Sequence, residues 1–457
     1  MAFLPVIALV GRPNVGKSTL FNRLTRSRDA IVDNQPGITR DRLYGRGKVG
    51  ERPFLVVDTG GLEAEDGPFR AQIRQQVEQV VEEAQVVILM VDGEQGLVHQ
   101  DREIAERLRQ SDRRILVAAN KTEGEDPHLA AADFQELALG DPLAISALRG
   151  DGIDRLVEAA MAGFAHDDAE EADAPPRIAI VGRPNVGKST LTNRIVGSER
   201  VIVSDTPGTT RDSVRIPFEF AGRVLVAVDT AGVRRRSRVA EAVEKFSVIK
   251  TLQSIEDADV VVLVLDASSE IGAQDASIAG MVQDLGRSVV VVVNKWDGLE
   301  GRQRRRIRDE LARKLPFLPD PEILFVSALH GSNTSEVMPA VIGALDSAMV
   351  ELGTASLNRT LRAAVTQTPP PMHHNRPVKL KFAHQAGKNP PVVVVHGNRA
   401  EALPASYVRY LGRYFANAYR LRGTRVRVIP RSGENPFADR KGTSRPSQGS
   451  SRRRRKL

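Results

Sequence analysis

The stretch Gly11-Arg-Pro-Asn-Val-Gly-Lys-Ser-Thr19 follows the apolar run Val6–Val10 and decides the fold of the first part of the chain. A Gly-x-x-x-x-Gly-Lys-Ser loop between a strand and a helix wraps its backbone N–H groups around phosphate oxygens, and its lysine reaches the β- and γ-phosphates of a nucleotide. The same stretch recurs without change at Gly182–Thr190, again after an apolar run. For a single copy a structural glycine turn is the alternative, but two identical copies predict two nucleotide sites.

An internal repeat extends beyond these two loops. The offset along the sequence that relates the loops also relates Pro36–Asp41 to Pro207–Asp212 and Asp58–Gly61 to Asp229–Gly232. The offset is slightly larger between Asn120-Lys121 and Asn294-Lys295, and larger again between Ser146-Ala147 and Ser327-Ala328. Small insertions of this kind belong in loops. The sequence therefore predicts a duplicated domain.

Apolar runs alternate with helical stretches in each copy. In the first copy the runs are Val6–Val10, Phe54–Val57, Val86–Val91, Ile115–Ala119 and Leu143–Ile145. This alternation predicts an α/β fold in which a mostly parallel sheet carries helices on both faces. The longest apolar runs, Val260–Leu265 and Ser288–Val293, are expected as buried strands, because they fall far short of the ~18 residues that span a bilayer.

Composition favours a folded globular chain. Hydrophobic residues make up 41% and charged residues 27% of the sequence, which is ordinary for that class. Met1–Val10 has neither a basic flank nor a small-residue cleavage site, so we expect a strand there and not a secretion signal. The chain has no cysteine, which excludes disulfides. We therefore expect a cytoplasmic monomer without membrane contact.

Pattern and composition divide the 457 residues into five parts. These are a first nucleotide-binding domain (1–165), an acidic linker that ends in two prolines (166–176), a second nucleotide-binding domain (177–350), a smaller α+β domain (351–437) and a disordered basic tail (438–457). In the α+β domain we expect strands at Val378–His384, Val392–His396 and Thr424–Arg431, and a helix at Ser406–Leu421.

The net charge of +8 is unevenly distributed. Residues 351–457 hold 22 Lys and Arg against four Asp and Glu, which leaves the first 350 residues at −10. A chain with an acidic body and a basic end is expected to place that end on a polyanion, and we expect RNA.

Each copy carries residue types that suit a Mg²⁺ shell. Ser18 and Ser189 follow the loop lysines, and Asp58 and Asp229 follow apolar strands. Hydroxyl and carboxylate oxygens at these places hold the Mg²⁺ that bridges nucleotide phosphates, while the glycines after each aspartate let the backbone approach the γ-phosphate.

Thr39 and Thr210 lie equally far along the sequence from the Mg²⁺-site serine of their own copy, each in a loop rich in Gly, Pro and Arg. We expect them to close the metal shell over the γ-phosphate, as the threonines of switch loops do. A threonine that stabilises a turn or caps a helix is the alternative.

The base is read by an Asn-Lys-x-Asp motif. Its aspartate accepts hydrogen bonds from N1–H and N2–H₂, a donor pattern that guanine presents and adenine lacks. Asn294-Lys-Trp-Asp297 fits fully, and the Ser327-Ala328 that follows supplies a backbone N–H for the guanine O6. The first copy has Glu123 in place of the aspartate. We expect guanine specificity in both sites, with the first site weaker or more tolerant.

The candidate site residues follow from these motifs. In the first copy the GTP-binding candidates are Gly11, Arg12, Pro13, Asn14, Val15, Gly16, Lys17, Ser18, Thr19, Asp58, Thr59, Gly60, Gly61, Leu62, Asn120, Lys121, Thr122, Glu123, Ser146 and Ala147. In the second copy they are Gly182, Arg183, Pro184, Asn185, Val186, Gly187, Lys188, Ser189, Thr190, Asp229, Thr230, Ala231, Gly232, Val233, Asn294, Lys295, Trp296, Asp297, Ser327 and Ala328. The catalytic candidates are Lys17, Thr39, Gly61, Lys188, Thr210 and Gly232, and the Mg²⁺ candidates are Ser18, Thr39, Asp58, Ser189, Thr210 and Asp229.

Neither copy has the glutamine that orients the attacking water in many GTPases, because Leu62 and Val233 occupy those positions. Hydrolysis is therefore expected to rely on the backbone, the metal or a partner. Similar GTPases with an asparagine at the position of Asn14 and Asn185 bind K⁺ beside the phosphates, so we expect K⁺ as a second cofactor. A role of these asparagines in stabilising the loop is the alternative.

Two complete motif sets in one chain, followed by a basic α/β domain, resemble the EngA (Der) family of bacterial tandem GTPases over nearly the whole chain. Further similar stretches are Pro-Gly-x-Thr-Arg-Asp in both copies, and Val233–Val239 leading into Val243–Thr251. The resemblance implies GTP hydrolysis coupled to assembly and stability of the 50S ribosomal subunit, with a KH-like third domain.

The third domain departs from ordinary KH modules, because it lacks the Gly-x-x-Gly loop that clamps a nucleic-acid backbone. The nearest stretch, Gly387-Lys-Asn-Pro390, does not fit. We therefore expect electrostatic contact with rRNA rather than sequence readout, through Arg409, Arg413, Arg420, Arg422, Arg425, Arg427 and the tail cluster Arg452–Lys456. For the helix arginines a merely solvated face is the alternative.

Two other function classes stay open at this level. One is a nucleotide-gated RNA-binding scaffold whose slow hydrolysis only resets it. The other is a P-loop kinase or ATPase, which is disfavoured by the Asn294–Asp297 motif and by the lack of an acceptor-binding lid signature.

Overall fold

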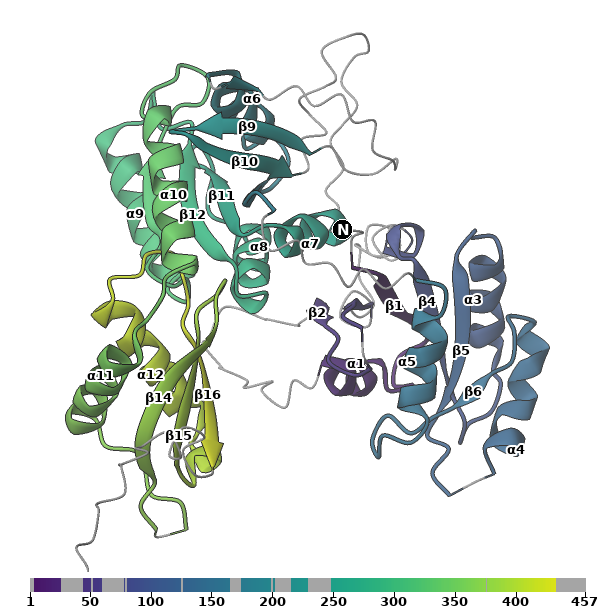
Figure 1. Ribbon diagram of the computed structural model, residues 1–457. Coiled ribbons are helices and arrows are strands. Elements are labelled where there is room, and N and C mark those ends of the chain that lie inside the picture. The colour runs from purple at the N-terminus through teal and green to yellow at the C-terminus, as the bar shows by residue number, and fades with distance from the viewer. Residues whose placement is uncertain are drawn as a thin grey trace, which may run out of the picture. The chain divides into compact units, whose positions relative to one another are not determined.

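The computed structural model of the chain describes residues 4–25, 44–50, 52–59, 78, 80–124, 126–164, 174–198, 200–201, 215–228, 248–374 and 376–432 (Figure 1). By internal contacts the chain forms two compact units, Met1–Met349 with Leu421–Arg425, and Val350–Arg420 with Val426–Leu457. The larger unit contains both repeats.

The first repeat is built on a six-stranded sheet in the order β2-β3-β1-β4-β5-β6. Its strands are β1 (Val6–Val10), β2 (Tyr44–Arg46), β3 (Leu55–Asp58), β4 (Val86–Asp92), β5 (Arg114–Asn120) and β6 (Leu143–Ala144). All neighbours pair in parallel except β2 and β3. The helices among the described residues are α1 (Lys17–Thr25), α3 (His99–Arg109), α4 (Pro127–Ala132), the 3₁₀ helix η2 (Asp133–Leu137) and α5 (Ile153–Met161).

Side chains alternate between the two faces of this sheet, as the period of a strand requires. Ile7 and Leu9 pack with α1 and α5, whereas Val6, Ala8 and Val10 pack on the face that carries α3 and η2. All five are buried. Because both faces are covered, β1 is a continuous apolar run and not an alternating one.

The second repeat has a seven-stranded sheet in the order β13-β12-β11-β7-β10-β9-β8. Its strands are β7 (Arg177–Val181), β8 (Arg200–Val201), β9 (Ile216–Phe220), β10 (Arg223–Val228), β11 (Val260–Asp266), β12 (Ser288–Asn294) and β13 (Glu322–Phe325). Its described helices are α6 (Lys188–Ser198), α7 (Val248–Asp257), α8 (Ala273–Asp284), α9 (Gly301–Lys314), the 3₁₀ helix η3 (Thr334–Glu336) and α10 (Val337–Ala348). The pairings with β9 are antiparallel and the others parallel.

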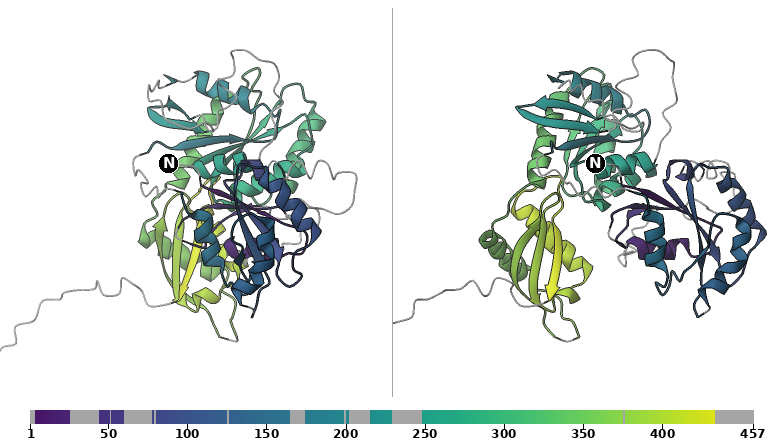
Figure 2. Two further views of the ribbon diagram at one scale, coloured as in Figure 1. Left: turned by 90° about the vertical axis from the view of Figure 1, so that its right-hand side faces the viewer. Right: turned by 45° about the vertical axis from the view of Figure 1, so that its right-hand side comes forward.

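The smaller unit has a three-stranded sheet in the order β14-β15-β16. Its elements are α11 (Thr354–Gln367), β14 (Lys379–Gly387), β15 (Val392–Asn398), the 3₁₀ helix η4 (Ala400–Ala402), α12 (Ala405–Ala418) and β16 (Arg427–Ser432). Strands β14 and β15 pair antiparallel, and β15 and β16 pair in parallel. Figure 2 shows α11 and α12 on the same face of this sheet.

The expected α/β fold with two mostly parallel sheets and a C-terminal α+β domain is confirmed. The sequence patterns did not predict α11, whose buried residues Leu357, Leu361 and Ala364 form a narrow stripe in an otherwise polar segment. The expected strand from Thr424 begins only at Arg427. Thr424 is instead held outside the strand, because its hydroxyl donates to the Ala344 carbonyl at 3.3 Å and lies 2.7 Å from the Ser288 Oγ.

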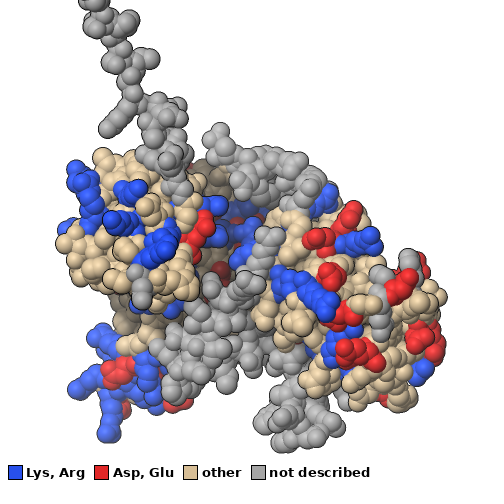
Figure 3. Space-filling view, turned by 90° about the horizontal axis from the view of Figure 1, so that it is seen from below, with Lys and Arg blue, Asp and Glu red and all other residues tan. Residues whose placement is uncertain are grey.

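Charge is distributed as the sequence suggests. On the face that Figure 3 shows, the smaller unit carries several Lys and Arg side chains and few acidic ones. Among the described residues, none of the helices is long and apolar enough to cross a membrane.

Candidate nucleotide-binding sites

The two phosphate loops lie at the carboxyl ends of the central strands. In the first repeat the loop runs from the end of β1 to Lys17, where α1 begins, and in the second from the end of β7 to Lys188, where α6 begins. A crevice at the carboxyl ends of parallel strands, with helix N-terminal N–H groups facing it, is the usual place for an anionic ligand in this class of fold.

Each loop lysine lies back over its own loop. The Lys17 Nζ donates to the Gly11 carbonyl and, at 2.9 Å, to the Arg12 carbonyl. The Lys188 Nζ donates to the Arg183 carbonyl at 2.8 Å. Lys17 is almost fully buried, so its charge is held close to the backbone N–H groups that would surround a phosphate.

An asparagine braces each phosphate loop against the base-binding side. The Asn120 Nδ2 donates to the Val15 carbonyl at 2.8 Å, and the Ala147 N–H donates to the Asn120 Oδ1 at 2.8 Å. Asn294 makes the equivalent bonds to Val186 and Ala328, both at 2.8 Å. The first residue of the Asn-Lys motif therefore joins the phosphate loop to the loop that the sequence predicts to face the base.

This brace explains the second glycine of each loop. A Cβ on Gly16 would lie 2.3 Å from the Asn120 Nδ2, and a Cβ on Gly187 would lie 2.2 Å from the Asn294 Nδ2. Both glycines also have a positive φ, +99° and +96°, which disfavours any other residue. The asparagine amide can approach the loop only because these positions lack a side chain.

Of the residues that we expect to hold Mg²⁺, the structure describes Ser18, Asp58 and Ser189. In the first repeat the Ser18 Oγ donates to the Asp58 Oδ2 at 2.8 Å, so a hydroxyl and a carboxylate oxygen lie together beside Lys17. The next residue, Thr59, is fixed by a bond from its Oγ1 to the Leu9 carbonyl at 2.7 Å. In the second repeat Ser189 follows Lys188 in the first turn of α6.

Several sequence candidates fall outside the described residues. They are Thr39, Gly60, Gly61 and Leu62 in the first copy, and Thr210, Asp229, Thr230, Ala231, Gly232 and Val233 in the second. The similar stretches Pro36–Asp41, Pro207–Asp212 and Val233–Val239, and the tail from Ala438, also lie outside them.

The base-reading carboxylates are held alike despite their different lengths. Glu123 accepts a hydrogen bond from the Ser146 hydroxyl, and this bond lowers the pKa of Glu123. A hydrogen bond from Ser327 likewise lowers the pKa of Asp297. Each carboxylate is therefore kept ionised as an acceptor. In the second repeat the His330 Nε2 also lies 3.0 Å from the Asp297 Oδ2.

A pair of aspartates that we did not single out from the sequence positions the motif lysines. The Lys121 Nζ lies 2.6 Å from the Asp92 Oδ2, and the Lys295 Nζ lies 2.6 Å from the Asp266 Oδ2. Burial acts to raise the pKa of Asp266, but hydrogen bonds from Lys295 and Ser268 outweigh it and lower the pKa. Asp92 ends β4 and Asp266 ends β11. The sequence offset between these aspartates equals the offset between Lys121 and Lys295. A search of the repeat for matching acidic residues could therefore have found them.

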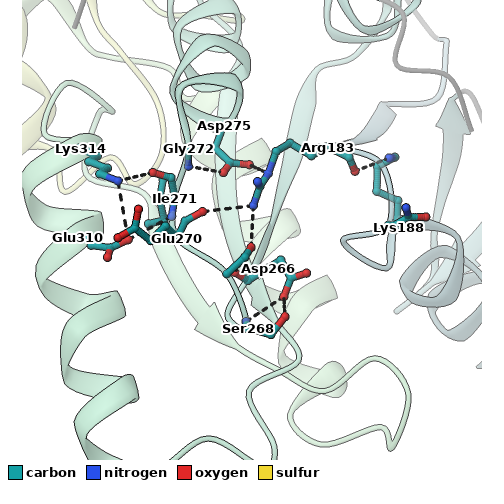
Figure 4. Close-up of polar contacts among 12 residues, drawn as sticks. Arg183, Lys188, Asp266, Ser268, Glu270, Ile271, Gly272, Asp275, Glu310 and Lys314 are labelled. Atoms are coloured by element: carbon teal, nitrogen blue, oxygen red, sulfur yellow. Dashed lines mark hydrogen bonds and ion pairs between the residues drawn. The ribbon is translucent and has the colours of Figure 1, made fainter. Parts of the chain in front are cut away.

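An arginine of each phosphate loop reaches a buried aspartate in a helix farther along the same repeat. The Arg12 Nε lies 3.3 Å from the Asp101 Oδ1 in α3, and the Arg183 Nε lies 2.8 Å from the Asp275 Oδ1 in α8. Figure 4 shows Arg183 also reaching Glu270 in the loop before α8, where its Nη2 donates to the carbonyl at 3.4 Å. The same Nη2 donates to the Ser269 Oγ at 2.9 Å. Burial raises the pKa of both aspartates.

The second repeat extends this network to α9. The Ile271 N–H donates to the Glu310 Oε2 at 3.1 Å, and the Lys314 Nζ donates to the Ile271 carbonyl (Figure 4). Glu310 is buried. The loop between β11 and α8 is thus held from one side by the phosphate-loop arginine and from the other side by α9.

Comparison with known proteins identifies the family. Residues 6–121 and 177–295 match the family described as "50S ribosome-binding GTPase". Residues 352–431 match the family described as "KH-domain-like of EngA bacterial GTPase enzymes, C-terminal". Both matched regions of the first family contain a phosphate loop and an Asn-Lys pair.

Three relatives with the name GTPase Der match the chain over nearly its full length. The protein of Azoarcus sp. (strain BH72) is 53% identical over 438 residues, which cover 95% of this chain and 99% of the relative. That of Chromobacterium violaceum is 52% identical and covers 95% and 92%. That of Thioalkalivibrio sulfidiphilus is 50% identical and covers 99% and 98%. The chain belongs to the GTPase Der (EngA) family.

Proposed function

We propose that this chain binds GTP at both sites, hydrolyses it to GDP and phosphate, and acts as a double switch in the assembly of the large (50S) ribosomal subunit. The observation that carries this proposal is the pair of braced phosphate loops, each joined by an asparagine to its base-binding loop. Membership of a family of 50S ribosome-binding GTPases supplies the biological context.

Mg²⁺ is the first cofactor of this proposal. The Ser18 hydroxyl and the Asp58 carboxylate, 2.8 Å apart, fit an ion that takes a few protein oxygens and leaves its other positions to phosphate oxygens and water. Ser189 takes the same place in the second site, and the sequence adds Thr39, Thr210 and Asp229. Bound there, Mg²⁺ would neutralise charge that develops on the phosphates.

K⁺ is the second proposed cofactor. Asn14 and Asn185 have positive φ angles of 65° and 63° and are exposed at the tips of their phosphate loops, so their side chains are accessible beside the phosphates. A monovalent cation there would add positive charge in sites that lack the water-orienting glutamine. We expect faster turnover in K⁺ than in Na⁺ at equal ionic strength, and equal rates would refute this role.

The residues of each site have separate tasks in the proposed reaction. Lys17 and Lys188 hold the β- and γ-phosphates together with the loop N–H groups. The carboxylates of Glu123 and Asp297 accept the guanine N1–H and N2–H₂ groups, and the backbone near Ala147 and Ala328 faces the base O6. Backbone groups at Gly61 and Gly232 and the switch threonines Thr39 and Thr210 are proposed to position the γ-phosphate and water.

The basic C-terminal region is the proposed contact with rRNA. Arginines on and around α12 that the sequence singled out are exposed, namely Arg409, Arg413, Arg420, Arg422, Arg425 and Arg427. Their charge suits a phosphate backbone without base readout.

We propose the division 1–165, 166–176, 177–350, 351–437 and 438–457, a cytoplasmic location and a monomeric state as parts of the same function.

The function is tested by two measurements on the full chain. GTP hydrolysis should be measurable for the wild type and about 10² to 10³ slower in the double variant Lys17→Ala/Lys188→Ala. The wild type should also co-sediment with purified 50S subunits in a manner that depends on whether a GTP analogue or GDP is bound. Hydrolysis of ATP at the same rate as GTP, or sedimentation independent of both nucleotides, would contradict the proposal.

A further inference from the structure

Helix α9 of the second repeat carries an unusual concentration of positive charge. Its 14 residues include seven Lys and Arg and two acidic residues. One of the two acids, Glu310, is buried, and it contacts Arg306 at 3.4 Å and Lys314 at 3.9 Å. Five arginines, Arg302, Arg304, Arg305, Arg308 and Arg313, are exposed on the same helix. We call these five residues the α9 arginine face.

The described part of the fold gives this charge no acidic partner. Among the described residues, no acidic group lies within ion-pair distance of the α9 arginine face. The helix is anchored by Ile307 and Leu311, which are buried on its other side. Like charges three or four residues apart destabilise a helix, as do cations near its N-terminus, and the first turn of α9 has no acid. A helix surface that only needs to be solvated usually mixes both signs of charge.

The first repeat has no such surface at the corresponding place. The segment between its base-reading motif and its last strand contains α4 and η2, residues 127–137, which have no Lys or Arg and two acidic residues. The two copies share their phosphate loops letter for letter. The positive helix is therefore a feature of the second repeat and not of the fold.

Two of the arginines lie against aromatic rings. The guanidinium carbons of Arg304 and Arg308 lie 5.6 and 5.9 Å from the centre of the Trp296 ring, and Arg308 lies 5.0 Å from that of Phe325. A stacked guanidinium is held in place through its face and keeps its edge N–H groups for other acceptors. Such groups suit the oxygens of a phosphate backbone.

We infer that the α9 arginine face is a second RNA-contact surface, which binds the phosphate backbone of large-subunit rRNA from the second repeat and not from the C-terminal region. The inference rests on the proposed function, since that function makes rRNA the polyanion that is present. Unpaired arginines in a row along one helix complement a row of phosphates.

The test uses the full chain and three of the arginines. The variant Arg302→Gln/Arg305→Gln/Arg313→Gln leaves Arg304 and Arg308 on Trp296, so the base-reading segment is not touched. The matched control is Arg107→Gln/Arg109→Gln/Arg155→Gln, which removes the same charge from exposed arginines of α3 and α5 in the first repeat. The probes are purified 50S subunits and, separately, deproteinised large-subunit rRNA.

The α9 variant should bind both probes about tenfold more weakly than the wild type, and its plot of log affinity against log salt should be shallower by about 2 to 3. The control should bind like the wild type. The α9 variant should melt no lower than the wild type, because it loses like-charge repulsion and a cation near the helix N-terminus, and all three proteins should have the same GTPase rate without RNA. Wild-type affinity of the α9 variant, or an equal loss in the control, would overturn the inference while leaving the proposed function intact.

Two other outcomes are also decisive. If the α9 variant binds 50S subunits weakly but deproteinised rRNA normally, α9 contacts a ribosomal protein and the inference is wrong. If the wild type binds neither probe, the proposed function itself fails in its choice of partner, and the inference fails with it.

Discussion

Asn120 in the first repeat and Asn294 in the second make the same pair of hydrogen bonds, all at 2.8 Å, whereas the carboxylates that follow them differ by one methylene. The phosphate end of each site is thus the same structure built twice. At the other end of each site a serine holds a carboxylate in both repeats, but this carboxylate belongs to a glutamate in the first repeat and to an aspartate in the second. Phosphate binding depends on backbone geometry that tolerates no change, whereas base reading depends on the reach of one side chain.

The difference grows with distance from the phosphates. The Arg12–Asp101 and Arg183–Asp275 contacts are still equivalent. Beyond them, only the second repeat, among the described residues, ties its loop to a helix through a buried glutamate, Glu310. That helix is strongly basic where its counterpart has no Lys or Arg. The two repeats therefore share the contacts of their phosphate loops and differ in the charge of this outer helix.

The largest expected effect separates the two sites. Lys17→Ala and Lys188→Ala should each lower hydrolysis at the changed site by about 10² to 10³, because a charged donor to the phosphates is lost. The activity that remains in each single variant then belongs to the other site. Steady-state GTPase assays on both variants measure it, with the double variant as the background. If the two single variants have identical residual rates and GTP affinities, the first site is not weaker than the second, and the expectation drawn from Glu123 is wrong.

The glycines at the asparagine brace give the next largest effect. Gly16→Ala and Gly187→Ala place a Cβ 2.3 and 2.2 Å from an asparagine Nδ2, and a non-glycine residue at these φ angles costs about 1–3 kcal/mol. GTP affinity at the changed site should fall about tenfold or more, as measured by fluorescent-nucleotide titration. Both repeats should respond equally, since their braces are the same.

The matched control for this pair is Gly197→Ala. Gly197 lies in α6, and a Cβ there would meet nothing within 4 Å. Alanine should instead stabilise the helix by about 0.5–1 kcal/mol without changing GTP affinity. A normal affinity in Gly16→Ala or Gly187→Ala would show that the brace does not set the loop geometry.

Exchange of the base-reading carboxylates is expected to have a smaller effect. Glu123→Asp should tighten guanine binding at the first site, and Asp297→Glu should weaken it at the second, each by up to about tenfold, because hydrogen bonds to a charged group contribute about 1.5–3 kcal/mol. Calorimetric titration in the background of Lys188→Ala or Lys17→Ala isolates each site. Glu106→Asp, at an exposed position of α3, serves as the control. Unchanged affinities would mean that the serine alone fixes the carboxylate at the right distance.

The smallest effect concerns protonation. Because Ser146 and Ser327 lower the pKa of Glu123 and Asp297, Ser146→Ala and Ser327→Ala should each raise the pKa of the paired carboxylate, as ¹³C NMR titration measures. A folded pKa below the unfolded one stabilises the fold at pH above the unfolded value, and this contribution is lost as the pH falls through the folded pKa. Each variant should therefore lose less stability on acidification than the wild type. A pKa that does not move would exclude the serine as its cause.

Local sequence signals were enough to predict the strands that lead into the phosphate loops. The run Val6–Val10 became β1 at the same residues, and the expected α/β architecture is observed, because buried parallel strands leave continuous apolar runs. Helix α11 was not predicted from the sequence patterns, since its few buried residues are a weak periodic signal. The Arg12–Asp101 contact was missed for another reason, because residues so far apart in the sequence meet only through the fold.

The sequence by itself was enough to predict two guanine-nucleotide sites whose expected base-reading residues differ, because phosphate and base recognition require fixed residue types at fixed spacing. Only the tertiary structure decided what surrounds them. It showed which buried aspartates hold the loop arginines and the motif lysines, and that Arg304 and Arg308 stack on Trp296. It also showed that the charge of α9 finds no acidic partner among the described residues outside Glu310. The physical reason is that pairing, burial and exposure depend on which distant segments the sheet brings together.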